Sequence, residues 1–158
     1  MRLALRAPAL MASALPGGSL FSFRVWIETM EDRVATRLLL LMAAGAVGTL
    51  CRYGLSGVVQ AGFGARFPWG TLVVNVAGCL VAGLLFGLFE SRWALSGEAR
   101  IVIFIGFLGA FTTFSGFMLE TSELARDAQW LGAAGNLALQ NGLGAAAMYG
   151  GLVASRLV

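Results

Sequence analysis

The residues best suited to chemistry in this chain are uncharged polar side chains that lie inside long apolar runs. Asn75 lies in the middle of one run, with Thr71 one helical turn before it, and Asn136 and Gln140 repeat this spacing in a later run. A carboxamide in hydrocarbon must find hydrogen-bond partners or line a wet path. Two polar stripes on two helices favour a hydrophilic track, and interhelical hydrogen bonds are the structural alternative.

A second polar group interrupts another apolar run between Gly106 and Phe117. A helix broken here would free backbone carbonyls on one side and amide groups on the other. In transporters, free carbonyls bind cations, whereas the amide groups of helix N-termini face anions. Phe114 and Phe117 share a helix face, and the edges of their rings carry partial positive charge that suits an anion. Thr113 and Ser115 add hydroxyl donors beside them. The alternative is a continuous glycine-rich helix whose phenylalanines only pack.

Arg52 and Glu120 are the ionisable residues nearest to the apolar runs. A charge at the centre of a bilayer is costly, so we expect both at interfaces or in water-filled vestibules. Arg52 there would attract anions into an entrance, or it would be an interface anchor with its charged end in water.

The composition is that of a membrane protein. Hydrophobic residues make up 58% of the 158 residues and charged residues 12%, whereas a soluble domain carries about 25% charged residues. The chain has neither histidine nor lysine, which removes the commonest general base and any Walker A motif. With no nucleophile–base pair either, we do not expect an enzyme. The arginines are scattered between apolar runs, so no nucleic-acid-binding surface is predicted.

Four apolar runs are each near the ~20 residues that a helix needs to cross ~30 Å of hydrocarbon. Without water to satisfy backbone groups, each run is predicted to be helical. The predicted fold is therefore an all-α membrane protein with one domain over residues 35–158, with helices at about 38–59, 69–89, 101–119 running on to about 125, and 130–157. Residues 1–34 are predicted to be a disordered extension or the result of a mis-called start, with Met30 as a plausible start of its own, and a short helix around residues 20–27 is the alternative.

Three segments together carry a family resemblance: residues 45–53, residues 70–78 and residues 109–117. They resemble the Fluc (CrcB) family of fluoride channels, and the similarity runs from about residue 38 to the end of the chain. The resemblance implies a passive, fluoride-selective channel that exports fluoride across the cell membrane and so reduces its toxicity. It also implies an antiparallel, dual-topology homodimer in the inner (plasma) membrane, with two pores and a broken third helix.

The resemblance also implies roles for individual residues. Carried over by position, the pore and fluoride-binding residues are Asn75, Phe114, Phe117, Ser115, Thr113, Thr71, Asn136 and Gln140. A structural sodium ion at the dimer interface would be held by the backbone carbonyls of Gly109 and Thr112 from both subunits. The partners implied are fluoride, the lipid bilayer and an inverted second copy of the chain. Gln140 departs from the tyrosine or serine that is commoner at its position, and Ala110 and Gly116 also differ from the family pattern.

Two other functions are consistent with part of the sequence. A small four-helix proton-coupled exporter needs a carboxylate deep in its first helix, where this chain has Arg52 near the far end instead. A non-conducting membrane assembly subunit would not need Asn75, Ser115 or Asn136 in the membrane interior. A heterodimer with a related chain also stays open beside the homodimer.

Overall fold

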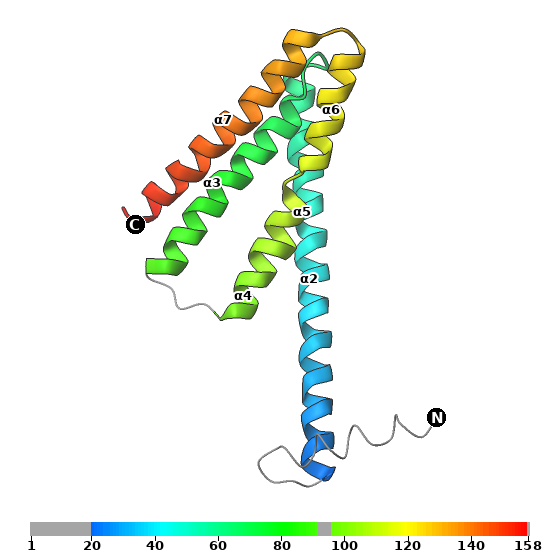
Figure 1. Cartoon of the computed structure of the whole chain (residues 1–158), viewed down its shortest axis with the longest axis vertical. Helices are drawn as coiled ribbons and strands as arrows, with labels where there is room; N and C mark the ends of the chain where they lie inside the picture. Colours follow the sequence, from blue (N-terminus) through cyan, green and yellow to red (C-terminus); the bar gives the residue numbers. More distant parts are fainter. Residues whose placement is uncertain (1–19, 92–95, 158) are drawn as a thin grey trace. The chain divides into compact units, whose positions relative to one another are not determined.

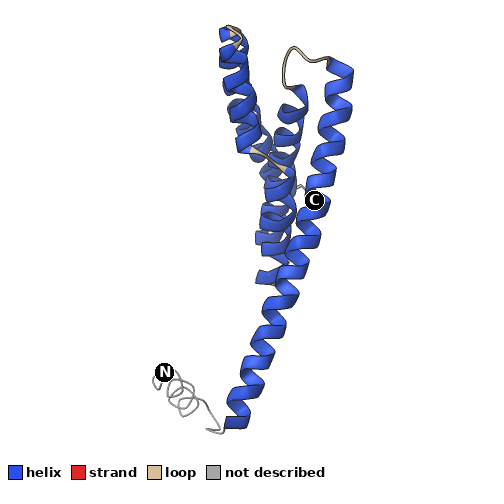
Figure 2. Ribbon diagram, turned by 90° about the vertical axis from the view of Figure 1, so that its right-hand side faces the viewer, coloured by secondary structure: helices blue, strands red, loops and turns tan. Residues whose placement is uncertain are grey.

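The computed structural model describes residues 20–91 and 96–157, with side chains described from residue 30 onward except at Ser91. In this part of the chain every regular element is a helix (Figure 2). In chain order the elements are α2 (Leu20–Phe63), α3 (Trp69–Ser91), α4 (Gly97–Ile101), the π-helical η1 (Val102–Leu108), α5 (Gly109–Phe111), α6 (Phe114–Arg126) and α7 (Trp130–Ser155).

The chain divides into two compact units, residues 1–39 and residues 40–158. In the first unit, residues 1–19 lie outside the described residues, and residues 20–39 form the first part of α2, with exposed side chains from residue 30 onward. The predicted N-terminal extension therefore falls partly outside the described residues and partly on α2. The second unit contains the rest of α2 and all later helices.

Several of these helices are long and apolar enough to span a bilayer. Among the described residues, three stretches meet this condition: Met30–Phe63, Trp69–Glu90 and Gly97–Arg126. Helix α7 has 26 residues, but its side-chain amides and glycines lower its hydropathy.

The third apolar run contains a break between two helical pieces. Helix α5 ends at Phe111, and the backbone is extended at Thr112 (φ −87°, ψ 160°) and Thr113 (φ −148°, ψ 115°) before α6 begins at Phe114 (Figure 1). The Thr113 hydroxyl then caps α6 by accepting a hydrogen bond from the Gly116 amide at 3.0 Å. The predicted break is therefore present, and it lies at the two threonines.

Helices α3 and α7 run side by side in very close contact (Figure 1). A Cβ atom at Gly83 of α3 would overlap the carbonyl oxygen of Met148, and one at Gly151 of α7 would overlap the carbonyl oxygen of Leu80. Small residues allow this approach where lipid offers no hydrophobic drive for helix association. The polar residues of the two helices thereby come within hydrogen-bonding distance.

The second half of α2 packs against the elements that frame the break. A Cβ atom at Gly48 would overlap the carbonyl oxygen of Phe107 in η1, and one at Gly70 would collide with Ser56 of α2. Gln60 also ties α2 to the start of α3, because its Oε1 accepts from the Gly70 amide at 3.0 Å and its Nε2 donates to the Phe67 carbonyl at 3.0 Å. These contacts place the first turn of α3 beside α2.

Candidate pore site

Asn75 of α3 occupies the break in the third run. The Thr113 amide donates to Asn75 Oδ1 at 2.8 Å, and Asn75 Nδ2 donates to the Thr113 carbonyl at 3.0 Å. The remaining amide hydrogen of Asn75 is directed to Oε1 of Gln140 on α7, at 3.0 Å. The Asn75 carboxamide therefore joins three segments that are far apart in sequence, and both of its hydrogens have partners.

This arrangement takes two backbone carbonyls out of helical hydrogen bonding. In a continuous α-helix the Thr113 amide would bond the Gly109 carbonyl, and the Gly116 amide would bond the Thr112 carbonyl. Here the first amide bonds Asn75 Oδ1 and the second bonds Thr113 Oγ1. Gly109 is exposed and Thr112 is half-buried. Carbonyls released at the end of a half-helix are suitable ligands for a monovalent cation, so this pair fits the predicted sodium ion.

A cavity of about 220 Å³ lies beside the break. We call it the pore cavity, and its lining residues are Asn75, Cys79, Thr112, Thr113, Phe114, Phe117, Gln140 and Asn141. It therefore brings together five of the eight predicted pore residues. The rings of Phe114 and Phe117 meet edge to face, with centroids 5.5 Å apart and planes at 72°. Phe117 is 4% exposed, whereas Phe114 is 74% exposed.

The other three predicted pore residues lie outside the pore-cavity lining. Ser115 is exposed, with its hydroxyl 3.4 Å from that of Thr113. Thr71 donates its hydroxyl to Oε1 of Glu120. Asn136 is fully buried, and its Nδ2 donates to Oγ1 of Thr121 at 2.9 Å.

Thr121 is a residue that sequence reasoning missed. Its hydroxyl donates to the Phe117 carbonyl at 2.7 Å and accepts from Asn136, so it connects α6 to α7. Its position one helical turn after Phe117 was the available signal. Two buried atoms near this region, Asn136 Oδ1 and Gln140 Nε2, have no hydrogen-bond partner among the described residues.

A second cavity, of about 460 Å³, lies on the α2 side of the break. We call it the arginine cavity, because Arg52 lines it together with Thr71 and Thr113. Thr113 also lines the pore cavity, so both spaces border the break at this residue. The predicted vestibule arginine thus faces the same space as the break.

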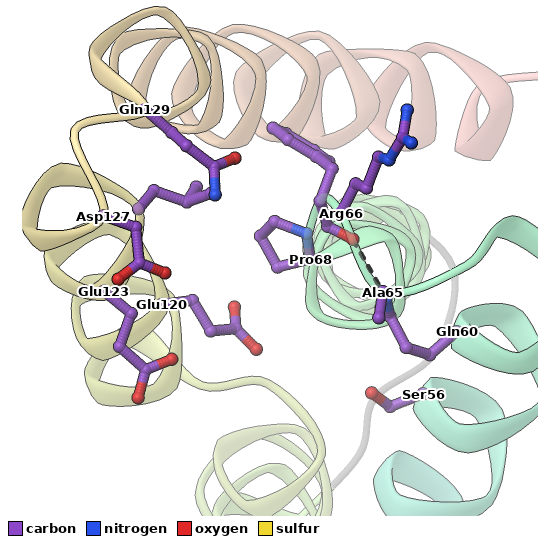
Figure 3. Close-up of a pocket in the computed structure, with 11 residues that line it drawn as sticks. Ser56, Gln60, Ala65, Arg66, Pro68, Glu120, Glu123, Asp127 and Gln129 are labelled. Atoms are coloured by element: carbon purple, nitrogen blue, oxygen red, sulfur yellow. Dashed lines mark hydrogen bonds between the residues drawn. The ribbon is translucent and has the colours of Figure 1, made fainter.

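A third cavity, of about 390 Å³, is the acidic cavity shown in Figure 3. It shares Ser56 and Gln60 with the arginine cavity, and carboxylates line one side of it. These are the side chains of Glu120, Glu123 and Asp127. Arg66 also lines this cavity, but its guanidinium is directed away from the carboxylates (Figure 3). The two predicted vestibule residues, Arg52 and Glu120, therefore line two different neighbouring cavities.

Comparison with known proteins places this architecture in a family. The profile described as "CrcB-like protein, Camphor Resistance (CrcB)" matches residues 39–152. Three similar proteins carry the name "Fluoride-specific ion channel FluC". The one from Desulforapulum autotrophicum is 52% identical over 122 residues, which cover 77% of this chain and 98% of the relative.

The other two relatives agree with this match. The protein from Nitrosococcus oceani is 48% identical over 122 residues, which cover 77% of this chain and 98% of the relative. The protein from Geobacter sulfurreducens is 40% identical over 121 residues, with the same two coverages, 77% and 98%. Together with the helices long enough to cross a bilayer, these matches identify a multi-pass membrane protein. The resemblance carried by the three sequence segments is confirmed, and the chain belongs to the CrcB family.

Proposed function

We propose that this chain is the subunit of a passive, fluoride-selective channel that exports fluoride across the inner (plasma) membrane and so reduces fluoride toxicity. The names of its relatives support fluoride as the conducted ion, and one structural observation supports the way in which the chain would conduct it. The break in the third run brings phenyl rings, threonine hydroxyls and three carboxamides around one cavity. The protein is a channel and not an enzyme.

The pore cavity suits a small, strongly hydrated anion. Ring edges, hydroxyl hydrogens and amide hydrogens can each replace part of a water shell, as the groups lining selective pores do. Each contact is weak on its own, so the ion is able to leave as well as to enter. Such a pathway conducts down the gradient without coupling to another reaction.

In the proposed assembly, four helices of each chain cross the membrane and two chains associate as an antiparallel, dual-topology homodimer. The exposure of the residues around the break supports this. Phe114 is 74% exposed, and Ser115 and Gly109 are exposed beside it. Phe114 and Ser115 belong to the predicted pore, and Gly109 belongs to the predicted cation site. A second copy of the chain packed on this surface would enclose them.

The proposal includes a structural sodium ion between the two copies. The carbonyls of Gly109 and Thr112 would hold it, because their helical partners are bonded elsewhere. When bound, the ion would supply a positive charge that neutralises the converging carbonyl dipoles of the two half-helices.

The test of the pore assignment is a pair of phenylalanine variants. We expect Phe114→Ile to abolish fluoride release from liposomes and to leave the dimer intact by size-exclusion chromatography, because isoleucine has no ring edge for the anion. Phe86→Ile is the matched control, since Phe86 lies on α3 and does not line the pore cavity. Wild-type release from Phe114→Ile liposomes would contradict the assigned pore.

A further inference from the structure

We infer that Asn75 is a positioning residue: its carboxamide holds the third helix open and thereby releases the Gly109 carbonyl for a cation. This inference rests on the proposed sodium site and adds a role for a residue that lines the pore cavity.

The first step is the pairing between Asn75 and the Thr113 peptide group. Oδ1 accepts from the Thr113 amide at 2.8 Å while Nδ2 donates to the Thr113 carbonyl at 3.0 Å. A carboxamide that pairs with both sides of one residue has its oxygen and nitrogen fixed by the backbone. Its second hydrogen is taken by Gln140 Oε1 at 3.0 Å. Asn75 has no amide hydrogen left for an anion unless one of these bonds opens.

The second step concerns what the Thr113 amide would do without Asn75. Thr113 is half-buried, and an amide shielded from water without an acceptor is costly. In a continuous helix the acceptor of the Thr113 amide is the Gly109 carbonyl. The same carbonyl is one of the two proposed sodium ligands. Asn75 Oδ1 and the Gly109 carbonyl are therefore alternative acceptors for the Thr113 amide. When Asn75 Oδ1 accepts the bond, the Gly109 carbonyl stays available for a cation.

The third step is that the two carbonyls are released by different side chains. The Thr113 hydroxyl occupies the Gly116 amide at 3.0 Å and so frees the Thr112 carbonyl. Only the Gly109 carbonyl depends on Asn75. Loss of the carboxamide should weaken the cation site without removing the N-terminal cap of α6.

The experiment measures how much sodium the purified full-length protein needs for its thermal stability, with sodium replaced by N-methyl-D-glucamine. We call the sodium concentration that gives half of the stabilisation the sodium midpoint. We expect Asn75→Leu, which keeps the branched shape of the side chain but removes all three hydrogen bonds, to raise the sodium midpoint roughly three- to tenfold, the equivalent of about one hydrogen bond. Asn75→Ser, whose short hydroxyl cannot pair with both sides of Thr113, should shift the midpoint in the same direction and guards against misfolding of the leucine variant.

Gln140→Leu is the comparison variant. It removes the hydrogen bond to Asn75 from the pore cavity but leaves the pairing with Thr113, so its sodium midpoint should stay at the wild-type value even if its fluoride release falls. Asn75 variants with the wild-type midpoint and lost fluoride release would overturn the inference, because Asn75 would then act only on the anion. A wild-type protein whose stability is independent of sodium would overturn the sodium site and the inference with it, but not the fluoride pathway.

Discussion

The Thr71 hydroxyl on α3 donates a hydrogen bond to Glu120 Oε1 on α6 at 2.5 Å, although 49 residues separate the two in sequence. Thr71 is buried and lines the arginine cavity, whereas Glu120 lines the acidic cavity. The bond therefore connects the linings of two neighbouring cavities. It also fixes the first turn of α3 against α6, one turn before Asn75.

Removal of the Thr71 hydroxyl should destabilise the protein. We expect Thr71→Val to lower the free energy of unfolding by about 1–3 kcal/mol, because the Glu120 carboxyl group loses its partner at nearly constant volume. Thr71→Ser keeps the hydroxyl and should stay closer to wild type. The measurement is the thermal unfolding midpoint of purified protein in detergent. Equal midpoints for the valine and serine variants would show that this hydrogen bond contributes nothing to stability.

Alanine substitutions at two neighbouring glycines of α7 should have different effects on the thermal unfolding midpoint. A Cβ atom at Gly151 would overlap the Leu80 carbonyl and crowd the Leu84 amide, whereas one at Gly150 meets nothing within 4 Å. Gly151→Ala should therefore lower the unfolding midpoint through overpacking that costs about 1–3 kcal/mol.

Gly150→Ala is the matched control for this packing. It should leave the midpoint unchanged or raise it slightly, because alanine is the better helix former. If both alanine variants unfolded at the same temperature, the close packing of α3 on α7 would be wrong.

The carboxylates of the acidic cavity should slow the passage of an anion. Glu123 and Asp127 are exposed side chains at the C-terminal end of α6, where the helix dipole also disfavours negative charge, so helix stability does not explain them. We expect Glu123→Gln/Asp127→Asn to raise fluoride release roughly two- to threefold at about 10 mM ionic strength, and less in 0.5 M salt, where screening removes the repulsion.

Glu90→Gln is the control for this charge change. It removes one carboxylate near the far end of α3, about 30 Å along the helix from Trp69, and Glu90 does not line the acidic cavity. Its fluoride release should match wild type at both salt concentrations. A double variant that behaves like Glu90→Gln would mean that the acidic cavity does not lie on the fluoride pathway.

The sequence was most informative where local chemistry decides the structure. The helices of the apolar runs follow from hydropathy, and the threonines among the glycines indicated a break that the structure places at Thr112 and Thr113. The π-helical turn of η1 was not predicted, because a single inserted residue leaves no periodic signal over so short a segment.

The partners of the polar residues were harder to predict. Asn136 and Gln140 have the same spacing as Thr71 and Asn75, yet Gln140 bonds Asn75 while Asn136 bonds the unpredicted Thr121. Which of two stripe residues faces which neighbour depends on the register between helices, and glycine contacts far from the site set that register. The side-chain spacing within one helix does not contain this information.

The most direct measurement is fluoride release from liposomes that contain only this purified chain. The liposomes are loaded with potassium fluoride, and the carrier valinomycin makes them permeable to potassium. We expect rapid fluoride release on addition of valinomycin, because a passive channel moves fluoride alone and potassium must leave with it to balance the charge. Liposomes loaded with potassium chloride should release no chloride, because the channel is selective for fluoride. A proton-coupled exporter would instead release its substrate in response to a pH gradient. Fluoride release no faster than from empty liposomes would contradict the channel function.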